Sequence, residues 1–398
     1  MLVLDEFGKN YLLLGLRIGK LIEGYVESYY GLPELKEIVD MEQPSSPKRL
    51  LSVCNGLQQD LPNQGFPENR IKFLNKMLGA METSLKVANG ENIPYLEQVN
   101  KFYDIKPELV DDSIIYKAAE TLDEIYSGSG SLSDRINTLE KERAIPAEKI
   151  KEIFNHAFQI VQAKTKELFP NLLPKNEKFN IKIVKNQPWG ARATYLGNFN
   201  SQIEINTEIP ADWTNVLSLA SHEGYPGHHT ESSVKEKLLY LEEQQFEHCL
   251  VSYQVPNLVI SEGIANTGID VLFSPREIAT IGLEEICPFL EKEYNIDVLI
   301  AEYNARKTRF VLTNNLAFHT HVDGWSDEKL VKYGLNFGIL TENIIKHSLK
   351  FIHHPISSTY VFNYNMGEML IKKKYGERPS PADFKQLLTH QFLPSDLV

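Results

Sequence analysis

Residues 221–230 read SHEGYPGHHT, a His-Glu pair followed by a Pro-Gly step and two further histidines. In the zinc-protease motif H-E-x-x-H, the two histidines stand four residues apart on one helix. Here His222 is six residues from His228 and seven from His229. The stretch therefore indicates either a metal site on a deformed helix or a histidine-rich turn.

A proline inside the stretch bears on this choice. On a regular helix a six-residue step leaves the original face, and a seven-residue step moves about 10 Å along the axis. Pro226 lacks the N–H that would bond the His222 carbonyl, so the helix must open there. Gly227 permits a tight path, and a two-residue bulge would bring His228 to the position of the second histidine. We predict His222 and His228 as metal ligands, with His229 just behind them.

The third ligand is expected from residues 259–270, VISEGIANTGID. Glu262 is flanked by apolar and small residues, and such a carboxylate is costly to bury unless it is paired or coordinated. The small residues Ser261, Gly263 and Ala265 would allow close approach to the histidine helix. The alternative is a helix glutamate that faces solvent. We predict one Zn²⁺ per chain, although nitrogen and carboxylate ligands also admit Mn²⁺ or Co²⁺.

Glu223 follows the first ligand directly, as the general base does in H-E-x-x-H. It could take a proton from metal-activated water and return it to a leaving amine. The alternative is a solvent-facing helix residue.

The rest of the chain predicts a mainly α fold. Helical periodicity marks segments 8–29, 47–60, 68–88, 107–124, 131–143 and 147–168. Residues 178–206 alternate polar and apolar positions around a Gly- and Asn-rich connection, so we predict a small antiparallel β-sheet next to the active-site helix. A soft boundary near 170 separates a helical region, 1–170, from a catalytic region, 171–398, unless the two form one continuous domain.

Composition limits the partners. The net charge of −12 over 398 residues argues against nucleic acid or an anionic membrane surface. Three widely spaced cysteines suit neither a disulfide framework nor a thiolate site, which favours a reducing, cytoplasmic setting. The N-terminus lacks the features of a signal peptide, and no uncharged apolar stretch reaches about 18 residues. Oligomeric state stays open.

HEGYPGHH and SEGIANTG resemble the HE-x-x-PGHH and EGWA segments of the domain of unknown function 885 family, a group of gluzincin metallopeptidases related to carboxypeptidase Taq and thimet oligopeptidase. HVDGWSDEKL (321–330) and SSTYVFNYNMGEML (357–370) are similar to its H-x-x-GWS and P-G-Q-A-x-x-Y-x-x-G segments more loosely. The resemblance implies a multi-helical gluzincin-like fold with a deep channel that admits peptides or flexible tails.

The sequence departs from the family pattern at three places. Ile264 replaces the tryptophan after Glu-Gly, Ala317 stands where an acidic residue is expected, and Ser358-Thr359-Tyr360 replaces Pro-Gly-Gln. These differences leave the metal residues intact but affect the expected substrate preference.

Two tyrosines and a histidine are further candidates for catalysis. Tyr360 and Tyr364 are four residues apart on an expected helix and so share a face; tyrosines of related peptidases bind the oxyanion. Tyr364 matches the family motif, whereas Tyr360 stands in place of its glutamine. His321 would donate to the transition state or orient a ligand. Core packing is the alternative for all three residues.

For substrate binding, SQIEIN (201–206) is expected to form an edge strand to which a peptide adds. Residues 189–199 would line the cleft, with Tyr195 as a contact. Arg309 could hold a substrate carboxylate, or form an ordinary surface ion pair.

The sequence as a whole predicts a zinc-dependent metallopeptidase that hydrolyses peptide bonds of small peptides, with carboxypeptidase-like cleavage as one option. Two alternatives stay open: a metal-dependent hydrolase of a non-peptide amide, and a helical binding protein with a vestigial metal site.

Overall fold

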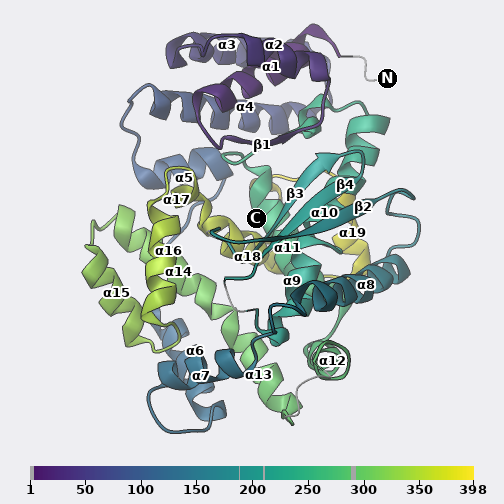
Figure 1. Ribbon diagram of the computed structural model, residues 1–398. Helices are drawn as coiled ribbons and strands as arrows, with labels where there is room; N and C mark the ends of the chain where they lie inside the picture. Colours follow the sequence, from purple (N-terminus) through teal and green to yellow (C-terminus); the bar gives the residue numbers. More distant parts are fainter. Residues whose placement is uncertain (1–3, 188, 209–210, 288–292) are drawn as a thin grey trace.

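The structure, a computed structural model, describes residues 4–187, 189–208, 211–287 and 293–398. Helices predominate and two small sheets lie among them (Figure 1), so the predicted mainly helical architecture with a small sheet is confirmed. No helix in the described ranges is long and apolar enough to cross a membrane. Cys54, Cys249 and Cys287 are buried and form no disulfide.

The first helices form a layer at one end of the molecule (Figure 1): α1 (Glu6–Leu21), α2 (Pro33–Met41), α3 (Pro47–Asp60) and α4 (Glu68–Ala88). The predicted helices 47–60 and 68–88 match α3 and α4, and Ser46 caps α3 by accepting from the Arg49 amide. The predicted helix 8–29 is too long. Its last part is β1 (Val26–Tyr29), which pairs antiparallel with β5 (Leu250–Ser252), 224 residues or so away along the chain.

Most of the remaining chain is helical. Three predicted helices begin up to five residues later than expected and end within about a residue of the expected position: α6 (Asp112–Ile125), α7 (Leu132–Glu142) and α8 (Ile150–Leu168). The others are α5 (Tyr95–Tyr103), α9 (Trp213–Glu223), α10 (His228–Lys235), α11 (Asn257–Leu272), α12 (Pro275–Ile281), α13 (Ile296–Arg306), α14 (Thr308–His321), α15 (Asp327–Asn336), α16 (Glu342–His353), α17 (Ser357–Tyr360), α18 (Phe362–Tyr375) and α19 (Pro381–Thr389).

The sheet before α9 is mixed, and this corrects two expectations. Its order is β2 (Lys178–Val184), β4 (Asn200–Asn206), β3 (Ala191–Gly197), with β2 parallel and β3 antiparallel to β4. The sheet is therefore not purely antiparallel, and SQIEIN lies in the central strand rather than at an edge. After β2 the chain forms β3 at the opposite edge of the sheet and then returns as β4 between them. The alternation of polar and apolar residues indicates which face of a strand is buried, but not which strands lie beside it.

Buried apolar side chains form two clusters. One joins α1–α6 to α11 and the C-terminal helices, and the other lies between α8, the sheet, α9 and α12. Because α8 precedes position 170 yet packs with the sheet that follows it, the two predicted regions share their cores.

Helices α11 and α18 touch backbone to backbone. A Cβ added at Gly367 would lie 2.1 Å from the Val259 carbonyl oxygen, and one at Gly263 would lie 2.6 Å from the Gly367 carbonyl oxygen. Gly263 therefore faces α18. Its small size had instead led us to expect close approach to the histidine helix. This contact brings Glu262 and the tyrosines of α17 and α18 together.

A methyl group at Gly367 should disrupt this contact. We expect Gly367→Ala to lower the free energy of unfolding in urea by about 3 kcal/mol, because the backbones of α11 and α18 would have to separate. Gly79→Ala is the matched control: a Cβ there meets nothing within 4 Å, and alanine in an exposed helix interior should stabilise by about 1 kcal/mol. Equal unfolding midpoints for the two variants would contradict this packing.

Candidate metal centre

The turn between α9 and α10 places the two histidines. Helix α9, capped by Asp212, ends at Glu223, and α10 begins at His228; the Tyr225–Pro226 peptide bond between them is cis. A Cβ at Gly227 would lie 1.9 Å from the His222 carbonyl oxygen, so only glycine fits there. The helix thus opens at Pro226 and takes a tight path at Gly227, as the sequence predicted.

His222, His228 and Glu262 converge. Each offers one ligand atom, and these atoms lie within 4.8 Å of one another. Nε2 of His222 is 3.6 Å from Oε2 of Glu262, and Nε2 of His228 is 3.7 Å from Oε1. Ligand atoms around a tetrahedral zinc ion are roughly 3.3–3.5 Å apart. The two nitrogen–oxygen separations are therefore within a few tenths of an ångström of those around one divalent ion.

Hydrogen bonds fix the imidazole tautomers. Nδ1 of His222 lies 3.0 Å from Oδ1 of Asn266, whose amide nitrogen donates to the Tyr364 carbonyl. Because a carbonyl oxygen can only accept, His222 carries its proton on Nδ1, and the Nε2 lone pair faces Glu262.

The second imidazole is oriented through a hydroxyl group. Nδ1 of His228 lies 3.1 Å from the Ser261 hydroxyl, which donates to Glu231 at 2.6 Å. Glu231 also accepts from Lys235 at 2.6 Å, and both of these charged residues are buried. His228 therefore donates from Nδ1 and, like His222, presents Nε2 to the ion, as ligating histidines held by outer partners usually do.

The charge state of the three residues also suits a metal. Burial lowers the pKa of His222 to about 3 and that of His228 to about 4, so both rings are neutral. Burial raises the pKa of Glu262 to about 8 despite the hydroxyl of Tyr360. Its Oε2 is buried and has no hydrogen-bond partner. A divalent cation would supply the missing partner and return the carboxylate to its charged form.

Glu223 lies beside this group. The Ala193 amide of β3 donates to its Oε2 at 2.7 Å. Burial raises the pKa of Glu223 to about 7; the Ala193 amide acts in the opposite direction, and the charge of Glu27 adds to the rise. A carboxyl group with this pKa can take up and release a proton near neutral pH.

The two tyrosines differ in their contacts. The Tyr360 hydroxyl donates to Oε1 of Glu262 at 2.5 Å and is therefore already engaged. Tyr364 is partly exposed, and its ring lies 5.6 Å from Tyr360 and 5.9 Å from Phe310. After burial, the charges of Glu262 and Glu223 are the largest causes of its raised pKa, so both carboxylates act on its hydroxyl electrostatically.

His229 points away from the other two histidines. Its Nδ1 is 2.7 Å from the Ser201 hydroxyl, and its Nε2 is 3.0 Å from Oε2 of Glu177. Burial alone would raise the pKa of Glu177, but hydrogen bonds from His229 and Tyr225 outweigh it and lower the value to about 2. Ser201 and His229 are buried, so this Ser-His-Glu series joins the turn to the sheet and cannot reach a substrate.

Three predicted site residues have other partners. Tyr195 is buried and donates to Glu236, so it does not line a cleft. His321 stacks on Tyr95 and lies 2.9 Å from the Ile352 carbonyl, and none of its described contacts reaches the metal group. Arg309 lies 3.3 Å from Glu140, which is the ion pair considered as its alternative.

Sequence reasoning missed the polar partners of the ligands. Asn266 follows Glu262 by four residues and so shares its helix face, a signal that was available. Ser261 was considered only for its size. Glu231 follows His228 by three residues, but nothing in the sequence indicates that a serine from another helix joins the two.

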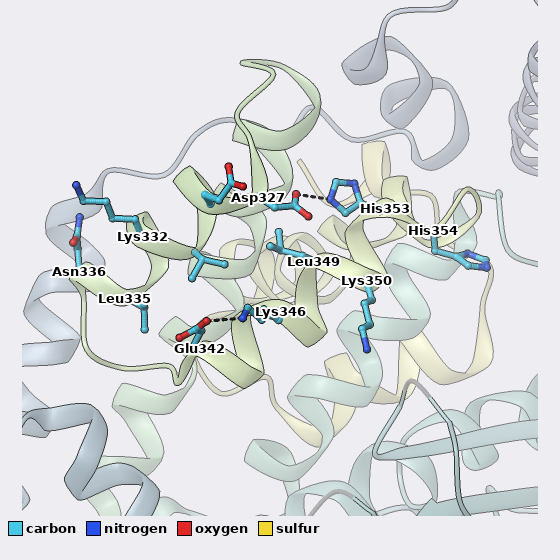
Figure 2. Close-up of a pocket in the computed structure, with 12 residues that line it drawn as sticks. Asp327, Lys332, Leu335, Asn336, Glu342, Lys346, Leu349, Lys350, His353 and His354 are labelled. Atoms are coloured by element: carbon cyan, nitrogen blue, oxygen red, sulfur yellow. Dashed lines mark hydrogen bonds and ion pairs between the residues drawn. The ribbon is translucent and has the colours of Figure 1, made fainter.

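A groove of about 920 Å³ lies elsewhere, between α15 and α16 (Figure 2). Asp327 pairs with His353 there and Glu342 with Lys346. His354 also lines it, and none of its lining residues belongs to the metal group.

Comparison with known proteins gives no family. No protein-family model matches the chain, and no curated protein matches it. The resemblance to the domain of unknown function 885 family therefore stays a prediction.

One of the similar solved structures shows a shared fold. A "putative lipoprotein" from Colwellia psychrerythraea has a TM-score of 0.52 and 13% identity over 89% of this chain and 66% of that one. The chain thus spans slightly less than two thirds of that protein. A "putative lipoprotein of unknown function" from Shewanella oneidensis has a TM-score of 0.43, 10% identity and coverage of 94% and 81%. An M32 carboxypeptidase from Deinococcus radiodurans R1 has a TM-score of 0.39, 11% identity and coverage of 96% and 88%.

The serine that orients His228 can be tested directly. We expect Ser261→Ala to weaken zinc binding about 10–100-fold in a chelator competition, because His228 loses the acceptor for its Nδ1 proton. Ser201→Ala, which removes the equivalent partner of His229, should leave zinc affinity within about threefold. The reverse order would mean that His229, not His228, is the second ligand.

Proposed function

We propose that this chain is a zinc-dependent peptidase that hydrolyses peptide bonds of small peptides. One observation carries the proposal: two neutral imidazoles and a buried carboxylate, one oxygen of which has no partner, converge beside a second buried carboxylate. His222, His228 and Glu262 would hold the ion. A protein that used the ion only for structure would have no need of Glu223.

Glu223 is the proposed general base. A bound zinc ion would polarise the substrate carbonyl and lower the pKa of a nearby water molecule. Glu223 takes the proton from the attacking water and passes it to the leaving amine. The Ala193 amide holds Oε2 and leaves Oε1 free for this transfer.

The tyrosines divide two tasks. Tyr364, whose hydroxyl is influenced by the charges of both Glu223 and Glu262, donates to the oxyanion that develops on the substrate carbonyl. Tyr360 holds Glu262 in its ligand orientation through the 2.5 Å hydrogen bond.

Peptide binding is assigned to β3 in place of the central strand β4. Ala193 directs its N–H to Glu223 rather than to β4, so the outer edge of β3 runs past the metal group. An extended peptide adding to this edge would gain main-chain hydrogen bonds whatever its side chains. This mode suits the peptide substrates that the resemblance implies.

Two further parts of the proposal rest on composition. The net charge of −12 favours neither nucleic acid nor an anionic membrane as partner. Three buried cysteines that form no disulfide fit a cytoplasmic setting. Hydrolysis of a non-peptide amide, or binding without turnover, would appear as an outcome of the first test below.

Two variants should distinguish a loss of turnover from a loss of metal. Zinc-loaded Glu223→Gln should keep its metal by elemental analysis and lose about 10²–10⁴-fold in turnover of short peptides, because the base is gone. Glu262→Ala should lose the metal. Glu120→Gln, an exposed helix position, is the control and should match the parent chain. Unchanged turnover in Glu223→Gln would reject the mechanism, and zinc binding without hydrolysis of any peptide in the parent chain would favour a vestigial site.

Substitutions of the two tyrosines should have different effects on turnover and on zinc affinity. Tyr364→Phe should lower kcat about 10²–10³-fold with unchanged zinc affinity, because only the transition state loses a donor. Tyr360→Phe should weaken zinc binding about 10-fold, because Glu262 loses its orienting donor. Equal zinc affinity in both variants, measured by chelator competition, would contradict the assignment of Tyr360.

A further inference from the structure

Glu27, in β1, lies near the metal group although it is almost 200 residues away along the chain. Its Oε1 accepts from the Tyr253 hydroxyl at 3.0 Å. The Tyr253 ring packs edge-on against Tyr360 at 5.8 Å, and Tyr360 donates to Glu262. Two tyrosines therefore connect Glu27 to a proposed metal ligand.

The chain around β1 also contacts β3. Tyr30, just after β1, packs on Tyr195 at 5.2 Å, and its Cβ lies where a side chain at Gly197 would point. Further along β3, Ala193 contacts Glu223. Glu27 thus stands between the strand proposed to bind peptide and the tyrosines beside the metal group.

The Glu27 carboxylate has no cation in contact. Among the described residues it forms no ion pair within 4.0 Å, and Oε2 accepts no hydrogen bond. The nearby Arg192 guanidinium lies over the Trp189 ring, 4.5 Å from its centroid, and donates to Thr194 instead. Arg192 lowers the pKa of Glu27 only in part, because burial raises it more.

Glu27 combines partial exposure with strong desolvation. Its side chain is half-buried, yet burial is the largest cause of its raised pKa. Tyr364, His222 and His228 show the same combination of partial exposure and desolvation. The charge of Glu27 also raises the pKa of Glu223 and Glu262, so Glu27 acts electrostatically on both carboxyl groups.

We propose that Glu27 binds the free α-amino group of the peptide substrate. This inference rests on the proposed function and names its substrate class: short peptides with an unblocked N-terminus. An ammonium group can donate to the open Oε2, and such charge-assisted hydrogen bonds are about twice as strong as neutral ones. Every unblocked peptide carries this group, so the contact complements sequence-independent binding along β3.

The test compares leucyl-alanyl-alanine with its N-acetylated form. Zinc-loaded parent chain should show at least 10-fold higher kcat/KM for the free peptide, and Glu27→Gln should bring the ratio close to one. Glu23→Gln, an exposed acidic position four residues upstream, is the control and should keep the parent ratio. Amidation of the C-terminus should change kcat/KM much less than N-acetylation.

A binding measurement keeps this test separate from the proposed hydrolysis. Calorimetry on zinc-loaded Glu223→Gln should show at least 10-fold tighter binding of the free peptide than of the acetylated one, even if the parent chain hydrolyses neither. Equal affinities, or a preference that survives Glu27→Gln, would overturn the proposal. Tight binding of an acetylated peptide that carries lysine would also overturn it, by assigning Glu27 to a side-chain ammonium. If Glu27→Gln fails to fold, the two peptides on Glu223→Gln still decide.

Discussion

The approach of Gly227 to the His222 carbonyl is the constraint on which the site depends. With no Cβ at position 227 the chain turns within four residues, and the imidazoles at either end of the turn face each other at a ring distance of 4.8 Å. Gly268 allows the same turn to pack on α11, because its Cα faces the Pro226 ring, where a Cβ would lie 3.0 Å away. Close backbone contact thus brings Glu262 to the histidines. A side chain at Gly227 would force the turn to open, and one at Gly268 would push the Pro226 ring away by a few tenths of an ångström.

Electrostatics indicates what a cation would contribute to this packing. Glu223 and Glu262 are both buried, and the charge of Glu223 raises the pKa of Glu262. A hydrogen bond such as that from Tyr360 contributes only about 1 kcal/mol net, or up to about 3 to a charged acceptor. This hydrogen bond does not offset the effect of burial on the pKa of Glu262, whereas a bound divalent ion would favour the charged carboxylate.

Sequence reasoning located what local chemistry determines. Residues close together in the chain determine the break at Pro226 and the need for glycine at 227. They also determine the boundaries of α3 and α4. It failed where the answer depended on distant neighbours. SQIEIN has the alternation of a strand, but its central position depends on the order in which the chain crosses the sheet. Tyr195 was expected in a cleft, yet its hydroxyl donates a hydrogen bond to Glu236, in the segment after α10. The spacing of His321 gave no indication that Tyr95 stacks on it.

The N-terminal strand β1 also depends on a distant part of the chain that the sequence pattern did not reveal. Residues 22–29 were expected to continue the first helix, but α1 ends at Leu21 and residues 26–29 form β1, which pairs with β5. That pairing places Tyr253 beside Glu27 and links the N-terminal helices to the residues around Glu262. A boundary drawn near residue 170 would assign Glu27 to one region and every metal ligand to another. Because the N-terminal region supplies a carboxylate to the surroundings of the metal group, its helices also hold part of the site in position.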